Sequence, residues 1–135
     1  VMACSNMEKT GQWLEDHILI KKSRSIEIVY SMINNAFDLP ANTKHALVTL
    51  KHKRDVFLEI DQYPKGATSR ASHEGMLPPC AAIGSFIHPE FEKLLEANKG
   101  QWVTRPIHRD GVVYKGKRAG TLRDPDGTLI EMIEV

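Results

Sequence analysis

The chain carries one strand pattern twice, once near its middle and once at its end. The first copy reads VFLEIDQY over residues 56–63, and the second reads TLIEMIEV over residues 128–135. Each copy places a glutamate, Glu59 or Glu131, between apolar side chains. Such self-similarity predicts two units of the same design, each too small to cover its own sheet alone.

The second copy follows a stretch with the composition of a tight turn, Asp-Pro-Asp-Gly at residues 124–127. Proline presets the first half of such a turn, and glycine takes the positive φ that follows. Because successive strand side chains point to opposite faces, Leu129, Glu131 and Ile133 share one face of the closing strand. The pattern therefore places an acid on an otherwise apolar face.

The first copy has the same arrangement. Glu59 shares its face with Phe57 and Asp61, while the neighbouring aliphatic side chains face the other way. The acids of the two copies are therefore equivalent positions. An acid on such a face either pairs with a base, for example Arg118 or Arg123, or takes part in binding or chemistry.

Apolar spacing and turn signals predict the other elements. In the first unit we expect a helix over residues 6–18 with Ser5 as its N-cap, a second helix from Ile26 that ends before Pro40, and strands over 44–51 and 54–63. In the second unit we expect a strand over 80–87, a helix over 88–100, and strands that include Trp102, Tyr114 and the closing copy.

These elements divide the chain into a first module over residues 1–63, a linker over 64–79 and a second module over 80–135. The linker assignment rests on three prolines and two glycines between the halves. The predicted fold class is α+β. Two βαβββ modules, the first with a shortened opening strand, together form one domain with a curved mixed sheet around a cleft and helices outside.

Composition narrows the function classes. The 135 residues are 41% hydrophobic and 26% charged with a net charge of +1, so no global field draws the chain to nucleic acid. No apolar run is long enough to span a bilayer. The two cysteines, Cys4 and Cys80, form neither a disulfide framework nor a zinc pattern. We therefore expect a cytoplasmic protein with no membrane or nucleic-acid partner.

Three segments resemble a known superfamily: SNMEKTGQWLEDHI near the start, FLEIDQYP at the first closing strand, and LRDPDGTLIEMIE at the end. Together they resemble the vicinal oxygen chelate proteins, which include glyoxalase I, bleomycin-resistance proteins and extradiol dioxygenases. The resemblance spans nearly the whole chain. It implies paired βαβββ modules that enclose a cleft, often with a divalent metal bound by residues from the first and last strands of each module.

The resemblance assigns two of the metal positions to Glu59 and Glu131. Ile83 stands where the second module's first strand often carries a histidine, and the first module's counterpart would precede Val1. Two carboxylates alone make an incomplete transition-metal site. We therefore expect no cofactor, while a weakly held divalent ion with a further donor such as His45 stays open.

The ligand-binding candidates are the two glutamates and six further residues. His45 shares a strand face with Leu47 and Thr49 and could look into the cleft. Aromatic residues on second-module strands serve the core or stack on a ligand, and both interpretations stay open. The other members come from the first strand of the second module and the first closing strand, so that the additional set is Phe57, His45, Ile83, Ser85, Trp102 and Tyr114.

Two functions remain. One is a metal-free protein of the bleomycin-resistance type that binds an amphipathic compound, and Ile83 favours this hypothesis. The other is a metal-dependent lyase, isomerase or dioxygenase acting on an oxygen-bearing small molecule, which the glutamate pair favours. We adopt the first as the leading hypothesis and assign no catalytic residue. A shortened first strand leaves a sheet edge unpaired, so we also expect a homodimer.

Overall fold

The computed structural model describes residues 1–69, 71, 73–77 and 82–135. The chain forms two compact units. The first consists of Val1–Glu15 and Leu19–Ala71, and the second consists of Asp16–Ile18 and Ser72–Val135. Cys80, with which the predicted 80–87 strand begins, lies outside the described residues, as does part of the predicted linker. Each unit contains a four-stranded sheet, and the α+β class is confirmed.

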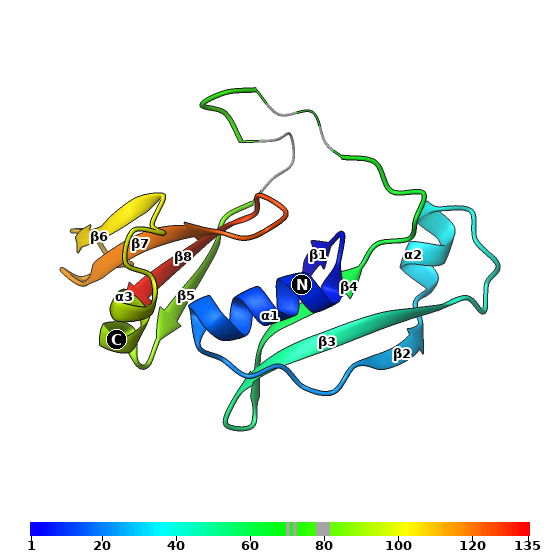
Figure 1. Ribbon diagram of the computed structural model, residues 1–135, viewed down its shortest axis with the longest axis horizontal. Coiled ribbons are helices and arrows are strands. Elements are labelled where there is room, and N and C mark those ends of the chain that lie inside the picture. Colours follow the sequence, from blue (N-terminus) through cyan, green and yellow to red (C-terminus); the bar gives the residue numbers. More distant parts are fainter. Residues whose placement is uncertain (70, 72, 78–81) are drawn as a thin grey trace. The chain divides into compact units, whose positions relative to one another are not determined.

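The first unit contains the sheet order β1-β4-β3-β2 (Figure 1). Strand β1 runs parallel to β4, and the other neighbours are antiparallel. The elements in chain order are β1 (Met2–Cys4), α1 (Met7–Ile18, whose last three residues belong to the second unit), β2 (Ile26–Val29), α2 (Ser31–Ala36), β3 (Lys44–His52) and β4 (Asp55–Gln62).

The second unit repeats this plan with the order β5-β8-β7-β6. Its opening strand β5 again runs parallel to its closing strand β8, and the other neighbours are antiparallel. The sequence repeat therefore corresponds to two βαβββ modules, with helix α2 inserted in the first. The elements of the second are β5 (Gly84–His88), α3 (Phe91–Ala97), β6 (Thr104–His108), β7 (Arg118–Arg123) and β8 (Leu129–Glu134).

Helix α1 begins one residue later than its predicted cap implies. The N-cap is Asn6, whose side chain accepts a hydrogen bond from the backbone N–H of Lys9 at 2.9 Å. Ser5 is therefore not the cap. Asparagine binds the free N–H groups of a first helical turn as well as serine does, so the shift costs the helix nothing.

The predicted second helix from Ile26 is wrong over its first half. Residues Ile26–Val29 form β2, which pairs with β3, and only Ser31–Ala36 are helical. The Ile-Glu-Ile-Val run is rich in β-branched side chains, which suit a strand better than a helix. Pairing of β2 with β3 overrode the helical spacing on which the prediction rested.

Each sheet has one face buried by a helix. In the first sheet, Val48 of β3 lines a hollow together with Met7 of α1, and Leu50 and Ile60 are fully buried on the same face. Glu59 alternates with Ile60 along β4 and therefore lies on the opposite face.

In the second sheet, helix α3 covers the face that carries Arg118 and Glu134. The Arg118 guanidinium lies 5.3 Å from the centre of the Phe91 ring and pairs with Glu134 at 2.6 Å. Met132 is fully buried on this face. Glu131 lies on the face opposite α3, as Glu59 lies on the face opposite α1.

The turn before β8 forms as predicted. Gly127 has a φ of 86°, and its N–H donates to the Asp124 carbonyl at 3.0 Å. The buried Asp124 side chain also accepts hydrogen bonds from the backbone N–H groups of Asp126 and Thr128 at 3.0 and 2.7 Å. These bonds fix the register in which β8 enters the sheet.

A glycine allows β6 to pack closely on β7. A Cβ atom at Gly120 would lie 2.6 Å from Cγ and 2.9 Å from the backbone nitrogen of Pro106. We expect Gly120→Ala to lower the free energy of unfolding by about 1–3 kcal/mol, because the backbone must move to admit the methyl group. Denaturant unfolding measures the change.

Gly66→Ala is the control. A Cβ there meets no atom within 4 Å, and its φ lies outside the left-handed range. This substitution should leave stability unchanged or raise it by up to about 1 kcal/mol. Equal losses from both variants would contradict the packing argument.

Candidate functional site

Glu131 is held by two hydroxyl groups on the open face of the second sheet. The Ser85 hydroxyl donates to Oε2 at 2.7 Å, and the Tyr114 hydroxyl donates to Oε1 at 3.0 Å. We call these three residues the Glu131 group. Both carboxylate oxygens accept a hydrogen bond, so the group fixes the direction in which the acid points.

The parallel pairing of β5 with β8 explains the position of Ser85. In this register Ser85 is the direct partner of Glu131. Ile83, which the resemblance assigned to a metal position, precedes β5 and is 44% exposed. Ser85, two positions later, is the residue paired with the acid. A serine hydroxyl donates a hydrogen bond to the carboxylate, which an isoleucine cannot do.

Tyr114 and Trp102 do not lie on strands, contrary to prediction. Tyr114 belongs to the turn between β6 and β7, which is closed by hydrogen bonds from Lys115 N–H to the Gly111 carbonyl and from Gly116 N–H to the Arg109 carbonyl. Positive φ values of 52° and 78° at residues 115 and 116 allow this compact shape.

Trp102 lies in the connection before β6 and is half-buried. Among the described residues it makes no hydrogen bond or ring contact with the Glu131 group. From the predicted set, the structure joins Ser85, Tyr114 and Glu131 by hydrogen bonds, and Trp102 does not take part in them.

A cation that the sequence analysis missed lies beside the Glu131 group. The Arg109 guanidinium carbon is 6.0 Å from the centre of the Tyr114 ring, and its buried Nε has no hydrogen-bond partner. Arg118, a base that the sequence suggested as a partner, pairs instead with Glu134 and Glu92 on the helix-covered face. Nothing in the spacing of Arg109 distinguishes it from other turn residues.

The hydrogen bond between Tyr114 and Glu131 affects proton binding. It raises the pKa of the Tyr114 phenol above its ordinary value of 10.0, and the charge of Glu131 and burial add to the effect. The nearby Arg109 works in the opposite direction. The phenol therefore stays protonated and remains a donor over a wide pH range.

Exposed aliphatic side chains surround the Glu131 group. Ile87 is two residues from Ser85 along β5 and is 62% exposed, and Ile107 of β6 is 53% exposed on the same face. The face thus offers an oriented acid beside apolar surface. In the closing strand the acid thus stands between aliphatic side chains and opposite the hydroxyl residues Ser85 and Thr121 of the neighbouring strands.

In the first sheet, His45 is buried on the face that carries Glu59, as the strand alternation predicted. Its Nε2 lies 2.6 Å from Oδ1 of Asn34 on α2. The Asn34 amide group donates to the carbonyls of Ala41 and Thr43, both at 3.1 Å, which fixes its oxygen toward the histidine. Nε2 therefore carries a proton and donates it to Asn34.

Asp61 is the second acid of this face and was not among the predicted site residues. It is only 6% exposed, and its buried Oδ1 has no hydrogen-bond partner. Burial raises the pKa of this carboxyl, and the charge of Glu59 raises it further, against weaker opposing effects of the Val1 amine and His45.

Phe57 is half-buried at a β-bulge in β4.

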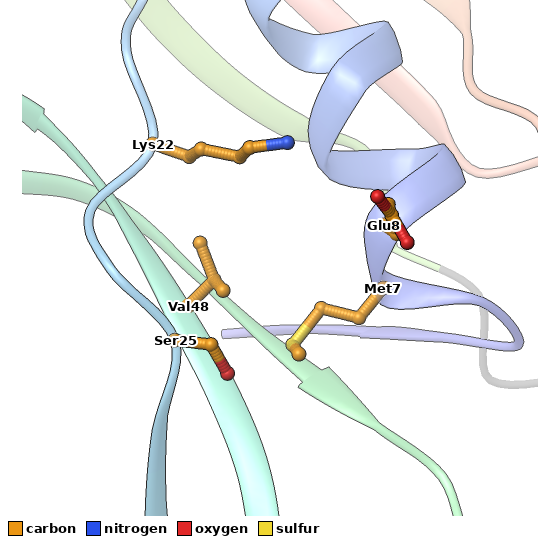
Figure 2. A pocket seen from close by; sticks show the side chains of 5 residues that line it. All are labelled: Met7, Glu8, Lys22, Ser25 and Val48. Atoms are coloured by element: carbon orange, nitrogen blue, oxygen red, sulfur yellow. The ribbon is translucent and has the colours of Figure 1, made fainter.

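A hollow of about 270 Å³ opens on the α1 side of the first sheet, and Figure 2 shows its lining. The Lys22 side chain reaches from the strand side toward the helix that carries Glu8, above Val48. Lys22 is already paired with Glu15 at 3.7 Å. The hollow lies on the face opposite Glu59, and no predicted site residue lines it.

The donor set within each unit does not fit a resident metal ion. Among the residues that the structure describes, no group of three His, Cys, Asp or Glu could hold one. In the second unit, each oxygen of Glu131 accepts a hydrogen bond from a hydroxyl group, and Glu131 is the only carboxylate of the Glu131 group. No described helix combines the length and apolar character that a membrane crossing requires.

These two modules define the fold class, and comparison with solved structures identifies it. The chain resembles a glyoxalase family protein from Bacillus cereus (TM-score 0.65, 11% identity, covering 98% of this chain and 89% of that one). It also resembles a glyoxalase family protein from Enterococcus faecalis (TM-score 0.61, 18% identity, 98% and 92% covered).

A third similar structure is a member of the glyoxalase/bleomycin resistance protein/dioxygenase superfamily from Sphaerobacter thermophilus (TM-score 0.56, 16% identity, 99% and 92% covered). No protein-family model and no curated protein sequence matches the chain. The fold is that of the vicinal oxygen chelate proteins, as the sequence motifs indicated.

The Tyr114–Glu131 bond predicts an altered titration. We expect the Tyr114 phenol to titrate above pH 10.0. The substitution Glu131→Gln should lower the pKa of Tyr114 toward 10.0. NMR of ring-labelled tyrosine measures both titrations. Because the folded pKa is raised, the associated stabilisation is complete below the unfolded pKa and is lost as pH rises through the folded value. An unchanged Tyr114 titration in Glu131→Gln would contradict the bond.

The donor count predicts the metal content. Protein purified without added metal should hold less than one equivalent of zinc, nickel, iron or manganese after dialysis, because stable transition-metal sites need three or four protein ligands. Elemental mass spectrometry checks this. One tightly held equivalent would refute the prediction and favour the metal-dependent hypothesis.

Proposed function

We propose that the protein binds a small amphipathic compound that carries hydrogen-bond donors, and that the Glu131 group recognises its polar end. The observation that carries the proposal is the orientation of Glu131 by Ser85 and Tyr114 on an open, largely aliphatic sheet face. Binding sites of this kind combine apolar surface with a few fixed polar groups.

The chemistry of Glu131 favours a ligand with donors. An ionised carboxylate offers about four acceptor positions, and the two hydroxyls take only two of them. A ligand N–H or O–H can therefore join the group without displacing Ser85 or Tyr114. Hydrogen bonds to an ionised group are roughly twice as strong as neutral ones. A positively charged donor is preferred because it is also attracted to the charge of the carboxylate.

Arg109 extends this recognition. Its Nε is buried without a partner, and its guanidinium lies beside the Tyr114 ring. A ligand oxygen near the tyrosine would accept a hydrogen bond from the NH₂ groups of the guanidinium, since the buried Nε itself is out of reach. The preferred compound therefore carries an acceptor next to its donor, with a hydrocarbon part that covers Ile87 and Ile107.

A thermal-shift screen tests the proposal. It compares arylalkylamines, which are cationic at neutral pH, with anionic arylalkyl carboxylates of similar size, on the wild type, Glu131→Gln and Tyr114→Phe. We expect the amines to raise Tm more than the carboxylates do, and each substitution to reduce that response, because a charge-assisted bond contributes about 1.5–3 kcal/mol. Shifts of β8 amide signals locate the binding.

Glu96→Gln is the matched control, since Glu96 is an exposed residue of α3 whose partner is the exposed Lys99. It should respond as the wild type does. The proposal fails if carboxylates stabilise the protein more than amines, or if Glu131→Gln and Glu96→Gln respond alike.

Homodimer formation stays a separate prediction, which light scattering at micromolar concentration would decide.

A further inference from the structure

The hollow on the α1 side of the first sheet contains an acid and a base that are not paired with each other. It measures about 270 Å³, and all of its lining belongs to the first unit. Figure 2 shows Lys22, Ser25 and Val48 on one side of it, and Glu8 and Met7 of α1 on the other. The hollow therefore combines one positive charge, one negative charge, a hydroxyl group and apolar surface.

The polar groups of this hollow are accessible and unsaturated. The Lys22 ammonium lies 3.7 Å from Oε2 of Glu15, which makes an ion pair but is longer than a hydrogen bond. Within the described part of the chain, the side chains of Glu8 and Ser25 make neither a hydrogen bond nor an ion pair. Both are exposed, and the Lys22 side chain is 30% exposed. A ligand can therefore reach all three groups.

The wall that carries Lys22 and Ser25 is anchored to β3. The Ser23 N–H donates to the Thr49 carbonyl at 2.7 Å, and the Thr49 N–H donates to the Ser23 hydroxyl at 3.1 Å. Lys22 also forms an isolated antiparallel bridge with Leu50. These contacts align the segment before β2 with β3, so the base and the hydroxyl group project from a supported backbone.

The opposite wall is the first turn of α1, which is also held in place. The Asn6 side chain accepts a hydrogen bond from the Lys9 N–H at 2.9 Å. The Met7 N–H donates to the side-chain oxygen of Gln62 at 3.0 Å, which joins the start of the helix to the end of β4. Glu8 lies between these two bonds, so its backbone is fixed at the edge of the hollow.

A glycine allows Lys22 to lie close to α1. A Cβ atom at Gly11 would be 3.3 Å from Cδ and 3.9 Å from Nζ of Lys22. Glu8, Gly11 and Glu15 follow one another at intervals of three and four residues and therefore share one side of the helix. Lys22 thus crosses α1 where no side chain stands, with one acid on each side of it along the helix.

The charges of the hollow select among possible ligands. A simple carboxylate would meet Lys22 but would be repelled by Glu8, and a simple amine would meet Glu8 but would be repelled by Lys22. Glu8 is the only carboxylate in the lining, so a metal ion lacks further ligands. A molecule that carries both an ammonium and a carboxylate group satisfies both side chains at once.

We propose that this hollow binds a small aliphatic α-amino acid. The ligand carboxylate accepts hydrogen bonds from the Lys22 ammonium and the Ser25 hydroxyl, and the ligand ammonium donates to Glu8. The aliphatic side chain packs on Met7 and on Val48, which is 5% exposed. Drug-sized ligands occupy pockets of about 300–1,000 Å³, so the smaller volume of this hollow suits a ligand of few atoms.

This site is independent of the Glu131 group. It lies in the first unit and on the helix-covered face of its sheet, whereas the Glu131 group lies on the open face of the other sheet. The two sites are therefore separable by variants and by the elements whose signals respond.

Titration with leucine and two of its analogues, followed by calorimetry and amide NMR, tests the site. Isoamylamine has the same aliphatic body without the carboxylate, and isocaproate has it without the ammonium group. We expect leucine to bind about tenfold more tightly than either analogue, because each analogue lacks one charge-assisted bond. Amide signals of the first turn of α1 and of residues 22–25 should shift.

Two substitutions remove one charge each. Glu8→Gln should weaken leucine binding about tenfold and leave isocaproate binding unchanged or stronger, because the repelling charge is gone. Lys22→Met should weaken leucine similarly and leave isoamylamine unchanged or stronger. Glu96→Gln and Lys9→Met, at exposed positions outside the lining, are the matched controls and should bind as the wild type does. A misfolded variant would instead lose all three compounds.

The proposal is overturned if leucine fails to bind at millimolar concentration, or if either analogue binds as tightly as leucine does. It is equally overturned if Glu8→Gln or Lys22→Met keeps wild-type affinity for leucine. A response to leucine that is confined to β8 and abolished by Glu131→Gln would overturn it while supporting the proposed function.

Discussion

Each unit depends on the parallel pairing of its first strand with its last. Strand β1 pairs with β4, and β5 pairs with β8, so residues far apart in the sequence become direct neighbours. This pairing decides which side chains share a face, because a slip of one residue would exchange the two faces of a strand. Ser85 meets Glu131 for this reason alone, and no local sequence pattern would reveal the contact.

The repeated acids have different surroundings. Glu131 accepts hydrogen bonds from two hydroxyl groups at 2.7 and 3.0 Å. Glu59, in contrast, is two residues from Asp61, an acid whose buried Oδ1 has no hydrogen-bond partner. A buried polar group without a partner costs about 1–3 kcal/mol, so proteins keep such groups where they serve a purpose other than stability. The sequence repeat provides equivalent positions for the two glutamates, and the neighbouring side chains give each glutamate different hydrogen-bonding surroundings.

The sequence predicted the fold class and the faces of the closing strands well, because alternation and turn chemistry are local. The Asp-Pro-Asp-Gly turn, the closing strands and the position of His45 all follow from short-range rules. The segment from Ile26 defeated those rules, since strand pairing overrode a helical spacing. Arg109 was missed because the turn before β7 brings it to Tyr114, and Asp61 because its burial without a partner for Oδ1 exists only in the folded chain.

The close contact between Pro106 and Gly120 affects whether a strand of another molecule can pair with the edge of the second sheet. Strand β6 forms one edge of the second sheet, and its ladder with β7 is interrupted between Thr104 and Ile107, where the proline lies. A proline has no N–H to offer, and an irregular edge is a poor template for an added strand. The second sheet is thereby protected against growing into a continuous fibre from this side, so ordered association is directed to other surfaces.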